Sequence, residues 1–281
     1  MVKVVTDSTS YLTTEDCVKY NISIVSLGVQ LNNNIIREVE VSNESFYLEM
    51  ESCEKIPTSS QPTPDEMYTT FENIVSKGDS VVAILLSSEM SGTYSSAHTI
   101  KSMILETYPD AQIEIVDSRT NCMQLGFIAI ESAKTAQNGG SIKDVVDTAN
   151  FVISNSRFLF TPDSLTYLKK GGRIGGAAAL FGNLLQIKPI LTVKDGQTEI
   201  YTKVRTKKKA IDALINGLLE DLNSHELGDI VVHHINCLDE GTALAHRLED
   251  ELGKKVCVKS IGPVIGLHVG PGSIGIAYHY R

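Results

Sequence analysis

The side chains best suited to chemistry are the hydroxyls that follow an apolar run at residues 81–86. Between Ser87 and Ser96, six residues are Ser or Thr, and Gly92 lies among them. A loop of this kind leads from a buried strand into a helix, whose first N–H groups lack partners within the helix and whose dipole favours negative charge. The loop has no Lys or Arg, so it suits a single carboxylate or oxyanion better than a polyphosphate. A capped helix after a core strand is the simpler interpretation, and it stays open here.

Small polar residues also follow two other apolar runs, as Thr6-Asp7-Ser8 and as Asp117-Ser118. In an open parallel sheet, the ligand crevice lies beyond the carboxyl ends of the strands, and these ends share one edge. A fourth polar cluster, Pro-Thr-Ser-Ser-Gln-Pro at residues 57–62, is held extended by its two prolines. We therefore expect a binding site at this edge.

The familiar catalytic and nucleotide motifs are missing from the sequence. It has no GxxxxGK[ST], no GxSxG and no HExxH. Residues 270–275 match GxGxxG but precede a strand-like apolar run rather than a helix, which indicates a tight turn. A stand-alone phosphotransferase or hydrolase acting on a small carboxylate or carbonyl compound remains the alternative function. Asp7, Asp117 and His268 would then be its acid, base or metal ligand.

Composition limits the other classes of function. The chain has 281 residues and a formal net charge of −9, which argues against nucleic acid as a partner. Its five cysteines are scattered with no CxxC, as expected in a reducing cytoplasm and not in a zinc site or disulfide framework. No apolar run reaches the roughly 18 residues of a membrane span, so we expect at most transient membrane contact.

Basic residues nevertheless gather in the second half of this acidic chain, at 169–173 and at 205–209. One interpretation is a solvated face whose charges favour helix ends. The other is a docking surface for an acidic partner or for the head of a phosphorylated ligand.

In the first half of the chain, predicted strands and helices alternate, and they position the polar clusters. Thr63 caps a helix there, with Pro64 in its first position and Glu66 closing a capping box. Apolar strands that alternate with helices predict a parallel sheet covered on both faces. The strands are expected at 3–5, 25–29, 81–86 and 113–116, and the helices at 64–77, 93–106 and 123–137.

The second half predicts hairpins and helices. Expected strands at 190–193 and 198–204 flank a turn at Asp195-Gly196, and this pattern predicts a hairpin. We predict an α/β fold with two domains: an N-terminal parallel-sheet domain at 1–156 and a C-terminal α+β domain at 157–281. Further strands are expected at 230–235, 255–258, 266–269 and 274–278, and helices from 161–163 to Gly171, at 208–222 and near 242–252.

The sequence resembles the DegV family, which includes the fatty acid-binding subunits of bacterial fatty acid kinase. The resemblance covers essentially the whole chain. Its motifs occur in order as VTDST, TSSQPTP, LLSSEMSGTYSSA, VDS, YLKKGGRIGGAAALFGNLLQIKPIL, VRTKKKAI and GPVIGLHVGPGSIGIAY.

The resemblance implies one long-chain fatty acid, such as palmitate, stearate or oleate, in a buried tunnel between two α/β domains. It implies no metal, no further cofactor and no catalytic residue in this chain. Hydroxyls of the two Ser-rich loops hold the carboxylate, which on this sequence places Ser59 and Ser91 there, with Gly92 and Thr93 beside them.

The first of these positions has an alternative register. The family usually has Thr where this chain has Ser59, and Thr58 or Ser60 would serve in a shifted alignment. The residues expected near the head group are Ser60, Asp7, Ser118, Arg173, His268 and Gly270.

The resemblance also implies a separate kinase catalytic subunit. That subunit phosphorylates the bound carboxylate to an acyl phosphate for phospholipid synthesis in the bacterial cytoplasm, and this chain acts as a carrier. We expect a monomer that docks on the kinase through Arg205 and Lys207.

Overall fold

The structure is a computed structural model that describes residues 1–31, 34–180 and 187–281. The described chain forms two compact units. Unit 1 comprises Met1–Val39 and Ser59–Ser154, and unit 2 comprises Glu40–Thr58 and Asn155–Arg281. The division into domains at residue 156 stays a prediction.

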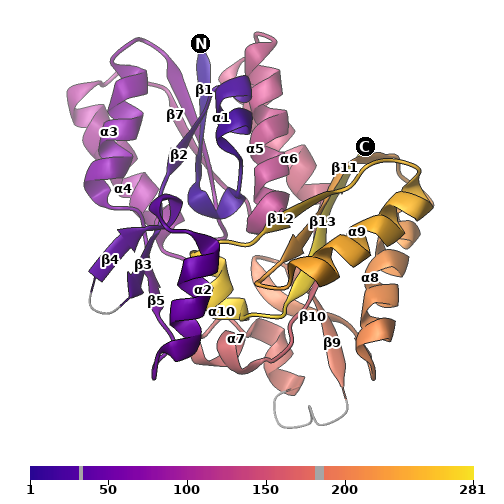
Figure 1. Ribbon diagram of the computed structural model, residues 1–281. Coiled ribbons are helices and arrows are strands. Elements are labelled where there is room, and N and C mark those ends of the chain that lie inside the picture. Colours follow the sequence, from indigo (N-terminus) through magenta and orange to yellow (C-terminus); the bar gives the residue numbers. More distant parts are fainter. Residues whose placement is uncertain (32–33, 181–186) are drawn as a thin grey trace. The chain divides into compact units, whose positions relative to one another are not determined.

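Unit 1 is built on a parallel sheet, as predicted. Its strands lie in the order β2-β1-β6-β7, and every neighbouring pair is parallel. Helices α3 and α4 pack on one face and α5 and α6 on the other (Figure 1). The strands are β1 (Val2–Asp7), β2 (Ile22–Val25), β6 (Ser80–Leu85) and β7 (Ile113–Asp117), and the helices are α1 (Thr14–Tyr20), α3 (Pro64–Val75), α4 (Thr93–Thr107), α5 (Cys122–Gln137) and α6 (Ile142–Ser154).

The strand predicted at 25–29 is wrong, because two strands lie there. β2 ends at Val25, and β3 (Gly28–Leu31) belongs to a small second sheet with β4 (Asn34–Arg37) and β5 (Thr58–Ser60). The backbone between β2 and β3 is bonded outside the parallel sheet: the Ser26 N–H donates to Glu66 and the Leu27 carbonyl accepts from Glu38. Continuous apolar character does not reveal such a change of partner.

Unit 2 contains a six-stranded mixed sheet in the order β10-β9-β8-β13-β11-β12, in which only β11 and β12 are parallel neighbours. The predicted hairpin joins β9 and β10 through Asp195 and Gly196, whose φ angles of 51° and 83° fit a type I′ turn. The strands are β8 (Ser156–Thr161), β9 (Lys188–Lys194), β10 (Gln197–Val204), β11 (Leu227–His234), β12 (Cys257–Ser260) and β13 (Ile274–Tyr280).

Helices α8 (Lys207–Leu222) and α9 (Leu238–Leu252) share one face of this mixed sheet. Leu159, Leu214, Val232 and Leu248 are buried between them and the strands. The expected C-terminal α+β architecture is therefore confirmed.

The strand predicted at 266–269 is wrong: those residues end the helix α10 (Pro263–Val269). Pro263 occupies its first turn, where a missing N–H costs nothing. The apolar run is too short to show a helical period, so its sequence pattern does not distinguish a buried helix from a buried strand. Tyr47 of α2 (Asn43–Ser52) donates its hydroxyl to the Ile261 carbonyl at 2.7 Å, just before α10 begins.

The short helix predicted from 161–163 begins later. Thr161 still pairs with Ile274 in the sheet, so the chain cannot turn into α7 (Thr166–Lys170) until it has left β8. The short 3₁₀ helix η3 (Gly175–Leu180) follows.

Candidate functional site

The polar ends of three parallel strands meet at one edge of unit 1, as predicted. The Leu86 N–H, after β6, donates to Asp7 Oδ2 at the end of β1, at 2.7 Å. The Ser87 N–H donates to the Thr120 carbonyl beyond β7 at 2.9 Å, and the Ser118 N–H donates to Leu85 at 3.0 Å. These bonds join β1, β6 and β7 at their carboxyl ends.

Asp7 organises this edge. Its carboxylate is fully buried, and its second oxygen accepts the Thr9 N–H at 3.0 Å and the Thr9 hydroxyl at 2.6 Å. Burial raises the pKa of Asp7 to about 6, and the bonds from Thr9 and Leu86 oppose that rise. Because both oxygens already accept hydrogen bonds, the geometry suits a group that positions the loop after β6.

The hydroxyl loop itself runs from Ser87 to the start of α4. Ser91 Oγ and Thr93 Oγ1 lie 2.9 Å apart, and the Thr93 N–H donates to Ser91 Oγ at 3.3 Å. The helix begins after Gly92, which supplies no side-chain cap, whereas Thr63 caps α3. The Ser91 hydroxyl therefore takes the place of a side-chain cap at the Thr93 N–H. The interpretation as a capped helix stays open beside that of a binding site.

The second Ser-rich segment lies beside this loop, because Gln61 bridges them. Gln61 Oε1 accepts the Ser96 hydroxyl of α4 at 2.5 Å. A Cβ built on Gly92 would lie 2.4 Å from Gln61 Nε2, so glycine is what allows this approach. Ser59 and Ser60 precede Gln61 and are half-buried, while Thr58 is exposed. The two segments that the resemblance singled out are thus neighbours within unit 1.

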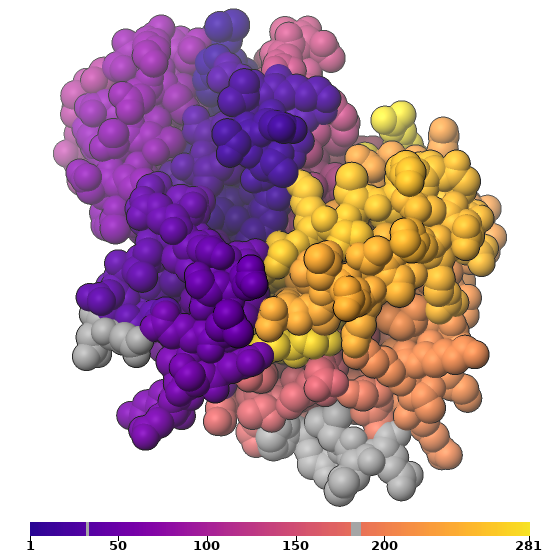
Figure 2. All heavy atoms as spheres, viewed as in Figure 1, coloured from indigo at the N-terminus to yellow at the C-terminus, as the bar shows by residue number. Residues whose placement is uncertain are grey.

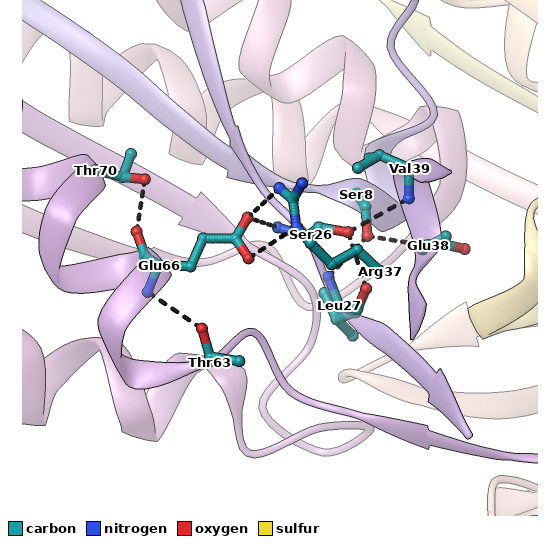
Figure 3. A network of polar contacts seen from close by, with 9 residues as sticks. All are labelled: Ser8, Ser26, Leu27, Arg37, Glu38, Val39, Thr63, Glu66 and Thr70. Carbon is teal, nitrogen blue, oxygen red and sulfur yellow. Dashed lines mark hydrogen bonds and ion pairs between the residues drawn. The ribbon is translucent and has the colours of Figure 1, made fainter. Parts of the chain in front are cut away.

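Figure 3 shows the polar contacts at the start of α3, which follows the segment at 57–62. The Glu66 carboxylate, in the first turn of α3, accepts from Arg37 Nη2 at 2.7 Å and from the Ser26 N–H at 2.8 Å. The Glu66 N–H donates to the Thr63 hydroxyl at 3.2 Å. The start of α3 is therefore anchored directly after Pro62.

Asn121 and Asp117 support the hydroxyl loop from the side of β7. Asp117 accepts the Ser88 hydroxyl at 2.6 Å and the Ser88 N–H at 3.2 Å. Asn121 is 5% exposed and donates its amide to Met90 Sδ at 3.1 Å. Its Oδ1 has no hydrogen-bond partner in the described part of the chain. The sequence gives no signal for Asn121. It places Gln61 in the polar cluster at 57–62 but does not reveal its contact with this loop, because only the fold brings the two amides there.

Three further predicted residues gather in unit 2. His268 lies near the end of α10, and a Cβ on Gly171 would lie 2.3 Å from its Nδ1. Arg173 donates to the Gly171 carbonyl at 2.7 Å. Burial, and then the charge of Arg173, lower the pKa of His268 to about 4, so its ring is neutral at pH 7. Gly270 ends α10 with a φ of 91°, where its backbone lies against the Tyr167 ring.

Unit 2 also encloses a small apolar cavity of about 10 Å³ between α10 and its sheet. Its lining is suited to hydrocarbon, and any larger occupant would have to move these side chains. The lining includes Phe158, Phe160, Ile235, Ile261, Ile265 and Val269.

Arg205 and Lys207, the predicted docking residues, are exposed at the start of α8. Lys207 pairs with Glu240 of α9 at 2.6 Å. Within the described ranges, no group of three or more His, Cys, Asp or Glu side chains could hold a metal ion. No helix in those ranges is long and apolar enough to cross a bilayer.

The chain is similar over its whole length to known proteins. A family model described as an uncharacterised protein of the DegV family matches residues 1–281. A DegV domain-containing protein of Clostridium acetobutylicum is 50% identical over 278 residues, which are 99% of this chain and 97% of that protein.

Two solved structures are similar over nearly the whole of both chains. DegV from Bacillus subtilis, described as a fatty acid binding protein, has a TM-score of 0.89 at 32% identity and covers 100% of this chain and 99% of its own. A stearic acid-binding protein from Eubacterium ventriosum has a TM-score of 0.89 at 28% identity, with 100% and 98% covered. The whole-length match and these identities show that the chain belongs to the DegV family.

Proposed function

We propose that this protein binds one long-chain fatty acid and presents its carboxylate to a partner kinase, which converts it to an acyl phosphate. The observation that carries the proposal is the hydroxyl loop of unit 1. This loop lies beside the Ser-rich segment at 57–62, because Gln61 contacts Gly92 and Ser96 at the start of α4. Gly92 itself supplies no side-chain cap to that helix.

The chemistry of this loop matches a monoanion. A carboxylate leaving water must receive hydrogen bonds, because an unpaired buried charge is very costly. Ser91 and Thr93 offer hydroxyls, and the first turn of α4 offers N–H groups and the positive end of its dipole. We assign the second hydroxyl to Ser59, with Thr58 and Ser60 as the alternatives.

The relatives support the identity of the ligand. The Bacillus subtilis and Eubacterium ventriosum proteins are described as binding a fatty acid and stearic acid. Burial of a sixteen-carbon chain contributes about 0.8 kcal/mol per CH₂, or roughly 12 kcal/mol before the loss of ligand freedom is subtracted. The acyl chain should therefore dominate affinity, and the hydroxyl loop should set the orientation of the head.

A carrier role fits the use of the nearby acidic groups. The oxygens of Asp7 and Asp117 accept hydrogen bonds that shape the loop, which supports a positioning role for both carboxylates. We propose a monomeric, cytoplasmic, non-catalytic subunit in phospholipid synthesis. Ser118, Arg173, His268 and Gly270 remain candidates for the surroundings of the head group.

The first experiment is native mass spectrometry of the purified protein, followed by denaturing extraction and lipid analysis. One fatty acid per chain is the expected result, and it would identify the preferred acyl chain. A bare protein that also fails to take up added palmitate or oleate would contradict the proposal. Turnover of ATP by the protein alone would favour the enzyme alternative.

A further inference from the structure

We propose that the groove between α8 and α9 in unit 2 receives an acidic segment of the partner kinase with an apolar side chain at its centre. This inference rests on the proposed function. It names a surface that goes beyond the two residues, Arg205 and Lys207, expected from the sequence.

The groove has a volume of about 390 Å³ and lies open at the surface. Ile211 of α8 and Leu244 of α9 contribute apolar lining, and Ala243 is an exposed small residue within it. Figure 2 shows the side chains of α8 and α9, in orange and gold, at the surface of unit 2. The full lining is Lys207, Lys208, Ile211, Glu240, Ala243, Leu244 and Arg247.

One end of the groove carries excess positive charge. The first turn of α8 is Lys207–Lys209 in sequence and contains no acidic residue. Cations there are repelled by the positive end of the helix dipole. The neighbouring α9 has the usual arrangement, with Asp239 and Glu240 in its first turn. The first turn of α8 thus carries positive charge at a position where such charge destabilises the helix.

Ion pairs within the groove neutralise only part of this charge. Lys207 pairs with Glu240 at 2.6 Å, and Arg247 pairs with Asp212 at 2.8 Å. Lys208 forms no ion pair with any described residue, and the same holds for Arg205 and Lys209, which flank the groove. Three cations therefore remain available to a partner.

The combination selects an occupant that is both acidic and apolar. The formal net charge of the chain is −9, so most of its surface repels an acidic protein while this end of α8 attracts one. The apolar lining between Ile211 and Leu244 gives a hydrocarbon side chain a place to lose its contact with water. Because the groove is concave, a side chain that projects from a protein segment can enter it, whereas the flat surface of a bilayer cannot.

The test uses palmitate-loaded protein and the purified kinase subunit, from the same organism, that phosphorylates palmitate on the wild-type carrier. Lys208→Glu reverses the charge, and Ala243→Trp fills the groove without changing charge. For both we expect the apparent KM for the loaded carrier to rise at least tenfold while kcat and palmitate affinity stay as in wild type. Lys254→Glu, an exposed lysine beyond α9, is the matched control and should leave KM unchanged.

Wild-type KM in both variants, with the fold confirmed by circular dichroism, would overturn the inference. So would variants that keep KM but lose binding to phosphatidylglycerol vesicles, since the groove would then contact lipid. If the wild-type protein binds no palmitate, the proposed function fails first, and this result is distinct from failure of the groove.

Discussion

At the scale of single residues, the polar groups of the candidate site have two roles: some are available to a ligand and others hold the backbone in place. Hydroxyls of Ser91 and Thr93 stand at the start of α4, whereas the carboxylates of Asp7 and Asp117 accept hydrogen bonds from the backbone that carries those hydroxyls. The hydroxyls could be predicted from residue type and spacing. Gln61 could not, because its role depends on a contact with Gly92 that only the fold creates.

We expect Ser91→Ala to weaken palmitate binding by about 1.5–3 kcal/mol, the contribution of a hydrogen bond to a charged group. Titration calorimetry on delipidated protein measures this change. Ser88→Ala is the matched control on the same loop, since its hydroxyl bonds Asp117 instead. Equal palmitate affinity in Ser91→Ala and wild type would reject the assignment of Ser91.

Asp7 should make stability depend on pH. Its folded pKa of about 6 exceeds the ordinary value of 3.8, so the folded state binds the proton more tightly. The stability that Asp7 contributes is fully present below pH 3.8 and falls by about 3 kcal/mol as the pH rises through 6. Relative to wild type, Asp7→Asn should therefore gain about that much free energy of unfolding between pH 4 and pH 7.

Urea denaturation of both proteins across this range measures the difference. Asp144→Asn gives a control of opposite sign, because hydrogen bonds from Ser141 lower the pKa of Asp144. A difference between wild type and Asp7→Asn that stays constant with pH would show that the carboxylate is not held as described.

At the scale of elements, prediction succeeded where a helix start or a turn has its own chemistry. Thr63 and Pro64 predict the start of α3, and Asp195-Gly196 predicts the turn of the β9–β10 hairpin. It failed at α10, where tertiary packing decides between helix and strand for a short apolar run. There Gly266 meets Tyr47 of α2: a Cβ on the glycine would lie 1.9 Å from the tyrosine oxygen.

Gly266→Ala should lower the free energy of unfolding by about 1–3 kcal/mol, because the added methyl has no room. Tyr47→Phe should cost about 0.5–1.5 kcal/mol through lost hydrogen bonds to Ile261 and Gly262. The double variant should lose less than the sum, since removing the hydroxyl removes the closest contact.

Urea denaturation of the four proteins provides this comparison. Gly241→Ala in α9 is the control, because its nearest neighbouring atom would be 3.2 Å from the new Cβ. Additive effects of the two substitutions would show that α2 and α10 do not pack as described.

At the scale of the whole molecule, fold class followed from the alternation of elements. Strands separated by helices predicted the parallel sheet of unit 1, and hairpins predicted the mixed sheet of unit 2. The membership of Glu40–Thr58 in unit 2 could not be predicted, because the hydrogen bonds from Asn43 and Tyr47 run to residues more than 200 positions away. The sequence around 40–58 carries no signal of those partners.

Removal of the ligand should lower the stability of the protein. A ligand that binds only the folded state adds about 2.7 kcal/mol when its free concentration is 100 times Kd. We therefore expect delipidated protein to melt at a lower temperature, and added palmitate to raise Tm in a concentration-dependent way. Ser91→Ala should need more palmitate for the same shift. A Tm that does not respond to palmitate would contradict the binding proposal.

The contact of α2 with α10 has a consequence for synthesis on the ribosome. Three side chains of α2 are buried in the folded protein: Phe46, Tyr47 and Met50. The Tyr47 hydroxyl donates a hydrogen bond to the carbonyl of Gly262, 215 residues later in the chain. At about 5–20 residues per second, that partner emerges roughly 10–40 s after α2. During this interval the nascent chain exposes an aromatic helix that has no partner yet. A chaperone that binds such segments should therefore crosslink to α2 on ribosomes stalled before α10, and release it once α10 has emerged.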